Sequence, residues 1–178
     1  MISMLSSGGS PHEDSFASAT TRWQRVRRLR PGDLLLGCAA LIVLPLAGPG
    51  LRRWGLQGAQ LRLSAWQPKR RRPVPAHLAL DAALRVAWVV EVAERRGIYR
   101  PNCLQRSLAL WWFLGMRGIA SEVRIGVRRR PGSPSGASTL DFHAWVEYGG
   151  IVLNDVADVR ERFATFPKAI APVNMRWD

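Results

Sequence analysis

The chain has 178 residues, enough for one domain with an appendage but short for two. Its hydrophobic fraction of 47% excludes a protein that is disordered as a whole. The formal net charge of +13 comes almost entirely from arginine, because Lys69 and Lys168 are the only lysines among 26 basic residues. Short arginine clusters without a nucleic-acid-binding motif favour solvated faces and loops over a binding patch. Two cysteines make no disulfide framework, which predicts reduced thiols and a cytoplasmic location.

The N-terminal part divides by composition. Residues 1–21 are rich in serine, glycine and alanine and lack the pattern of a secretory signal, so we expect a flexible tail. Residues 22–75 form a basic, apolar helical segment that ends in a proline- and arginine-rich linker. The run 34–51 is the most apolar of the chain. It is too short for a transmembrane helix, and its prolines and glycines interrupt it. We expect a packed or interfacial helix from Asp33 to about Leu44, with peripheral membrane contact through residues 34–51.

Cys38 lies within this apolar run. A thiol in such a context usually behaves as a small buried hydrophobe, so a structural role is predicted.

Residues 76–178 form the third part, in which the apolar spacing changes from helical to alternating. The spacing and the stop signals predict helices over residues 78–97 and 103–115 and strands over residues 121–127, 141–148 and 151–155. A polar loop rich in glycine, proline and serine separates the first two strands. This order predicts an α+β fold, with a helix packed on a small antiparallel sheet.

Cys103 lies in the first turn of the second helix, directly after Asn102, which can cap it. The positive end of the helix dipole stabilises a thiolate there and favours the nucleophilic form. Of the three histidines, only His143 lies in a predicted strand, and Asp155 follows twelve residues later. Because a nucleophilic cysteine needs a base and a group that orients the base, Cys103, His143 and Asp155 form a candidate triad.

The turn after residue 148 tests this triad. A strict two-residue Gly149–Gly150 loop would leave Asp155 on the wrong face relative to His143, unless the strand bends. Asp141 or Asp158 would then have to be reconsidered. A three-residue loop with a bulge sets His143 directly opposite Asp155, so the functional hypothesis predicts the longer loop.

The segment from about Leu80 to Phe166 resembles the transglutaminase-like cysteine peptidases that remove leader peptides in lasso-peptide biosynthesis. The resemblance is carried, in order, by the stretches NCLQRSLAL, GIASEVRIGV, FHAWVEYGG and VLND. HAWVE alone would indicate only the wider transglutaminase-like group. The resemblance implies a papain-like core in which Cys103 is the nucleophile, His143 the base and Asp155 the third member.

The resemblance also implies a substrate and partners. The substrate would be a lasso-peptide precursor, cleaved between leader and core before an ATP-dependent, asparagine-synthetase-like cyclase closes the ring. The first 75 residues do not resemble a leader-recognition domain, so that domain is expected to be a separate protein, with the apolar helix as a docking face. The chain has no glycine-rich phosphate loop and no metal-ligand cluster, so neither cofactor nor metal is expected.

Supporting roles are assigned more loosely. The oxyanion would be held by the backbone N–H of Cys103, with the side chain of Asn102 or Gln105 as a second donor. Arg106 is expected to form a salt bridge, and Trp145 either shields the site or packs in the sheet. Two other functions stay open: acyl transfer to an amine by the same triad, and a non-catalytic arginine-rich module that binds membrane or nucleic acid.

Overall fold

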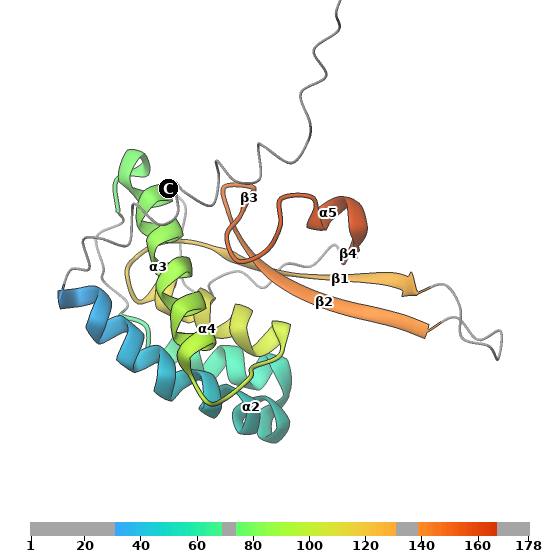
Figure 1. Ribbon diagram of the computed structural model, residues 1–178, viewed down its shortest axis with the longest axis horizontal. Helices are drawn as coiled ribbons and strands as arrows, with labels where there is room; N and C mark the ends of the chain where they lie inside the picture. Colours follow the sequence, from blue (N-terminus) through green and yellow to red (C-terminus); the bar gives the residue numbers. More distant parts are fainter. Residues whose placement is uncertain (1–30, 69–73, 131–138, 167–178) are drawn as a thin grey trace, which may run out of the picture. The chain divides into compact units, whose positions relative to one another are not determined.

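A computed structural model of the chain describes residues 31–68, 74–130 and 139–166 (Figure 1). The predicted tail and the arginines of the linker lie outside these ranges, so the domain boundary near residue 75 stays a prediction. The elements are α2 (Pro31–Ala65), α3 (Ala76–Arg96), α4 (Cys103–Gly115), β1 (Glu122–Arg130), β2 (Thr139–Tyr148), β3 (Ile151–Val152), α5 (Val159–Arg162) and β4 (Ala164–Thr165). This arrangement confirms the predicted α+β class.

Helix α2 is much longer than predicted. It does not end near Leu44 but continues through Pro45 and Pro49, and its helical path is interrupted only at Gly55, where φ is 64°. A proline inside a helix removes one backbone hydrogen bond and adds a steric clash. One face of the helix packs into the core, and this packing stabilises the helix against those local costs.

Cys38 is exposed, so the prediction that it is buried was wrong. The buried residues around it are Leu36, Ala40 and Leu44, which recur every fourth residue on one face of α2. Cys38 lies midway between Leu36 and Ala40 in sequence and therefore on the other side of the helix. Hydrophobicity identified the helix, but an almost uniformly apolar run does not reveal which face is covered.

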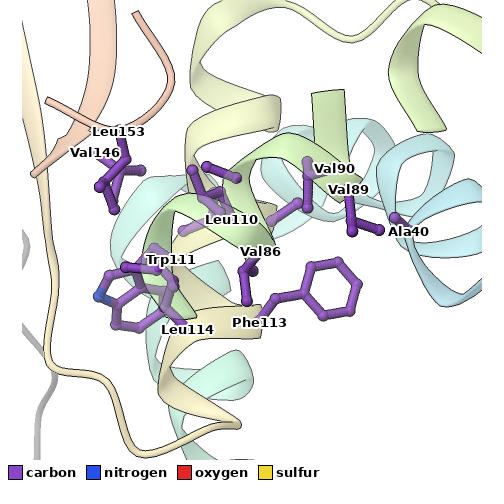
Figure 2. Packing of buried hydrophobic residues seen from close by; sticks show 14 of the residues in the cluster. Ala40, Val86, Val89, Val90, Leu110, Trp111, Phe113, Leu114, Val146 and Leu153 are labelled. Atoms are coloured by element: carbon purple, nitrogen blue, oxygen red, sulfur yellow. The ribbon is translucent and has the colours of Figure 1, made fainter. Parts of the chain in front are cut away.

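The core lies where α2, α3 and α4 meet, and it extends to one face of the sheet. Figure 2 shows Val89 of α3 beside Ala40 of α2, and Val86 of α3 beside Phe113 of α4. The buried residues of α4 are Gln105, Ser107, Leu108, Ala109, Leu110, Trp111, Phe113 and Leu114. Helix α4 is thus enclosed over most of its surface, which fixes the orientation of its first turn.

The sheet has the order β3-β2-β1-β4, and β1 pairs antiparallel with β2 in a register that sets Gly126 opposite His143. Helix α4 covers one face, and α5 lies on the other face, as Figure 1 shows. On the α5 side, Trp145, Val159 and Phe163 form a second small apolar cluster. A Cβ on Gly126 would lie 2.8 Å from the Cβ of Phe163, so only glycine allows this close approach.

The sequence patterns of β1 and β2 therefore predicted the strands but not the burial of both faces of β2 over residues 144–147. Both strands were expected to be half-buried, yet Val159 of α5 and Phe163 pack on Trp145 and cover the second face of β2 there. Neither α5 nor β4 was predicted, because each has only two to four residues and so no measurable periodicity.

The turn between β2 and β3 is the short one. Tyr148 pairs with Ile151, so the loop consists of Gly149 and Gly150 alone, both with positive φ. Two successive residues in the left-handed region are typical of a type I′ turn, whose twist matches that of the strands. The predicted three-residue loop was wrong, because the glycine pair itself supplies the tight turn without a bulge.

Candidate active site

The first turn of α4 is built by a capping box. The Asn102 side chain accepts a hydrogen bond from the Gln105 N–H at 2.9 Å, and Gln105 Oε1 accepts one from the Asn102 N–H at 3.0 Å. The Tyr99 hydroxyl donates to the same Gln105 oxygen at 3.0 Å. A capping box satisfies two of the four N–H groups that a helix start leaves open. The N–H groups of Cys103 and Leu104 remain outside the helix's own hydrogen bonds.

The side chains of Asn102 and Gln105 thus have a structural part in this turn. Their oxygens are engaged within the capping box, and Gln105 is nearly buried. The predicted cap at Asn102 is confirmed, whereas a role of either side chain at an oxyanion stays a prediction.

Ser107 anchors α4 onto β2. Its fully buried hydroxyl donates to the carbonyl oxygen of Ala144 at 3.0 Å and accepts from Asn154 Nδ2 at 3.1 Å. Residues i and i+4 share a helix face, so Cys103 lies one turn before Ser107 on the side that faces β2. Ala144 directly follows His143. The helix start that carries Cys103 is therefore directed toward the part of β2 that carries His143.

Asp155 reaches His143 despite the two-residue turn. The ladder between β2 and β3 includes only two residue pairs. Beyond it, the Val146 carbonyl oxygen still accepts from the Leu153 N–H at 2.9 Å, but the Val146 N–H donates to the side chain of Asn154 at 2.7 Å instead of to the backbone. The chain bends at this point, and Asp155 Oδ2 forms a hydrogen bond with His143 Nε2. The bend therefore compensates for the register, and neither Asp141 nor Asp158 is needed in its place.

The imidazole of His143 is held by two aromatic rings as well as by Asp155. The Phe163 ring stacks on it with a centroid distance of 5.0 Å, and the Trp145 ring lies 6.2 Å away at an interplanar angle of 27°. The Arg128 guanidinium lies over the Phe163 ring, 4.6 Å from its centroid, and pairs with Asp141 at 2.8 Å. These contacts restrict the rotation of the imidazole about its side-chain bonds.

Arg106 lies beside the carboxylate of Asp155. Its Nη2 is 4.0 Å from Asp155 Oδ2, and its Nη1 is 3.5 Å from Glu94 Oε2 of α3. Arg106 follows Cys103 by three residues, so both lie on the same side of α4. The salt bridge expected for Arg106 is present, and it places a positive charge next to Asp155.

Glu147 follows His143 by four residues in β2, and its side chain is buried, with only 4% of the residue's surface exposed. It accepts hydrogen bonds from Trp145 Nε1 at 2.7 Å and from Arg160 at 2.6 and 2.8 Å, and Arg124 lies 3.3 Å away. Burial raises the pKa of Glu147, but the hydrogen bonds from Arg160 and Trp145 and the charges of Arg160 and Arg124 hold it below its usual value. Glu147 therefore links Trp145 to α5.

Several residues of this site were missed in the sequence. Ser107, Asn154 and Phe163 carry the contacts that bring α4, the bend and α5 together, and only the stretch VLND gave a signal for one of them. Trp145 is fully buried, so sheet packing describes its position, and a role in shielding the site stays a prediction. In the described ranges no group of three or more histidine, cysteine, aspartate or glutamate side chains is arranged to hold a metal ion.

Comparison with known proteins identifies the family. The chain is 36% identical over 67 residues to the microcin J25-processing protein McjB of Escherichia coli. That match covers 38% of this chain and 28% of the relative. No solved structure matches the chain. The family model of the transglutaminase-like superfamily matches residues 43–167, from the middle of α2 to just beyond β4, and the chain therefore belongs to the transglutaminase-like superfamily.

Proposed function

We propose that this protein is a cysteine peptidase that removes the leader from a lasso-peptide precursor. The observation that carries the proposal is the His143–Asp155 hydrogen bond, which Asp155 connects through its contact with Arg106 to α4, the helix that begins at Cys103. The likeness to a microcin J25-processing protein supports the choice of substrate class. The family resemblance of the stretches around Cys103 and His143 supports the choice of nucleophile and base.

In the proposed mechanism, Asp155 keeps a proton on Nε2 of His143, so that Nδ1 carries the free lone pair. Nδ1 takes the proton from the thiol of Cys103, and the thiolate attacks the carbonyl carbon of the bond between leader and core. The negative charge that develops on the carbonyl oxygen is stabilised by the N–H groups of Cys103 and Leu104. Donors of this kind each contribute roughly a hundredfold or more to the rate.

The imidazolium of His143 then protonates the departing amine, and the core peptide leaves with a free N-terminus. A water molecule, deprotonated by the neutral imidazole, hydrolyses the thioester. The products are the leader with a new C-terminal carboxylate and the regenerated thiol. The positive charge of Arg106 stays beside the Asp155 carboxylate throughout.

The proposed pathway requires other proteins. The free amine of the core peptide is the group that an ATP-dependent, asparagine-synthetase-like cyclase would join to a side-chain carboxylate. We propose that a separate leader-recognition protein presents the precursor, because the first 75 residues do not resemble a leader-recognition domain.

The test is mass spectrometry of a candidate lasso precursor peptide incubated with the protein and its leader-recognition partner. The wild type and Cys38→Ala should each produce one cut between leader and core, because Cys38 lies on the exposed side of α2. Cys103→Ala should leave the precursor intact. Cleavage by Cys103→Ala, or an intact precursor with the wild type, contradicts the proposal. A product joined to an added amine instead of water would identify acyl transfer.

A further inference from the structure

Helix α2 has two apolar faces, of which the protein covers one. On the covered side, Leu36 and Ala40 pack into the core. On the other side, Leu35, Ile42 and Leu46 are 74%, 63% and 63% exposed in the described part of the chain, and Cys38 lies among them. A surface helix that faces water normally carries polar residues there. The face formed by Leu35, Cys38, Ile42 and Leu46 is called the outer face of α2.

The only acidic residue of α2, Asp33, is buried, and the other charged residues of the helix are arginines. Between residues 34 and 80 the sequence contains no aspartate or glutamate. Arg52 and Arg53 are exposed at the end of the outer face, and Arg53 follows Leu46 by seven residues, which places the two on the same side of the helix. Five further arginines lie between residues 22 and 30 of the sequence. Apolar side chains flanked by arginines, without acidic residues, match the surface of a bilayer that contains anionic phospholipids.

We propose that α2 lies flat in the headgroup region of an anionic membrane, with its outer face in contact with the lipid. The helix is long and apolar enough to cross a bilayer, with a mean hydropathy of 2.2 in a window that is 22% buried. A membrane-crossing position conflicts with the packing of α2, because side chains of α3 contact its covered face and α3 carries the exposed charges of Asp81, Arg95 and Arg96. A position in the plane of the interface leaves those charges in water.

The covered face is also fixed to the candidate active site. A Cβ on Gly48 of α2 would lie 2.7 Å from the Tyr99 hydroxyl and 3.0 Å from Gln105 Nε2. Gln105 forms the capping box with Asn102 before Cys103, and the Tyr99 hydroxyl donates to the side-chain oxygen of Gln105. The first half of α2 therefore cannot detach from the domain to insert across the membrane without opening the start of α4. A membrane on the outer face leaves this contact intact.

The test uses flotation of the full-length protein with vesicles of phosphatidylcholine alone or of phosphatidylcholine mixed with phosphatidylglycerol. The wild type should partition onto the anionic vesicles, and added salt should weaken the binding. The double variant Ile42→Glu, Leu46→Glu should lower the partition coefficient by roughly tenfold for each side chain. Leu78→Glu is the matched control, because Leu78 is 52% exposed on α3 and lies away from the outer face.

Charge is tested separately. The double variant Arg52→Gln, Arg53→Gln should weaken binding to anionic vesicles by roughly fivefold for each arginine. Circular dichroism should show the same helix content for all variants, because every substituted side chain is exposed. Absence of partitioning, or equal partitioning of the wild type and the Ile42→Glu, Leu46→Glu variant, overturns the proposal.

Cys38 provides a direct probe of the outer face. In a Cys103→Ala background, an environment-sensitive fluorophore can be attached to Cys38 alone, since the chain has two cysteines. Its emission should shift to shorter wavelength with anionic vesicles but not with neutral ones. A shift that requires a purified partner protein and never occurs with vesicles would instead identify a protein-binding face and overturn the proposal. Because these readouts involve no peptide cleavage, they are independent of the proposed function.

Discussion

The substitution Glu147→Gln tests whether the buried carboxylate holds α5 in place. Glutamine keeps an oxygen for Trp145 Nε1 but removes the negative charge that Arg160 and Arg124 contact. A hydrogen bond to a charged group contributes about 1.5–3 kcal/mol. The contacts with Arg160 count for less than this range, because Arg160 is 45% exposed and its guanidinium is hydrated again when the Glu147 charge is removed. We expect the free energy of unfolding to fall by about 2–3 kcal/mol at neutral pH, with the charge-assisted bonds as the main loss.

The lowered pKa of Glu147 determines how the stability of the protein changes with pH. The pKa of Glu147 in the folded protein lies below its usual value of 4.5, so the unfolded chain takes up the proton first as the pH falls. The stabilisation is fully present above that usual value and is lost as the pH falls through the folded pKa. Urea unfolding of the wild type and Glu147→Gln from neutral to acidic pH measures both effects. Equal stabilities at neutral pH, or a difference that is unchanged in acid, would refute the reasoning.

Two further substitutions test the contacts that shape the site. Asn154→Ala removes the acceptor of the Val146 N–H and the donor to Ser107. Hydrogen exchange at the Val146 amide should therefore accelerate, and the free energy of unfolding should fall by about 1–3 kcal/mol. Asn154→Asp keeps the acceptor and should retain the slow exchange. Gly126→Ala adds a methyl group 2.8 Å from the Cβ of Phe163, and urea unfolding should show a loss of about 1–3 kcal/mol; an unchanged midpoint would contradict the close packing.

Helices α3 and α4 could be predicted, and the members of the candidate triad could be singled out, because their signals are local. Helix α4 has a strong cap at Asn102 and a regular apolar spacing, and these fixed its start to the residue. Cys103 and His143 could be singled out since few residues in the chain can act as nucleophile or base. Asp155 followed from its distance in sequence and from the family resemblance.

The features that could not be predicted depend on contacts between distant segments. The sequence Gly149–Gly150 permits both turn lengths, and the two-residue turn was decided by the pairing of the flanking strands. Exposure of Cys38 depends on where α3 packs, which an apolar run does not encode locally. Likewise, the burial of Glu147 requires Arg160 from the short helix α5, whose four residues carry no recognisable pattern.

Asn154 explains why a register that seemed to exclude Asp155 still brings it to His143. A regular continuation of β3 would alternate its side chains between the two faces of the sheet, so Asp155 would point away from His143. By accepting the Val146 N–H with its side chain, Asn154 ends the ladder while keeping that N–H satisfied. Its Nδ2 also bonds Ser107 on the helix that carries Cys103. The Asn154 side chain thus ends β3 at the bend before Asp155 and links that bend to α4. This is the structural role of the asparagine in the stretch VLND.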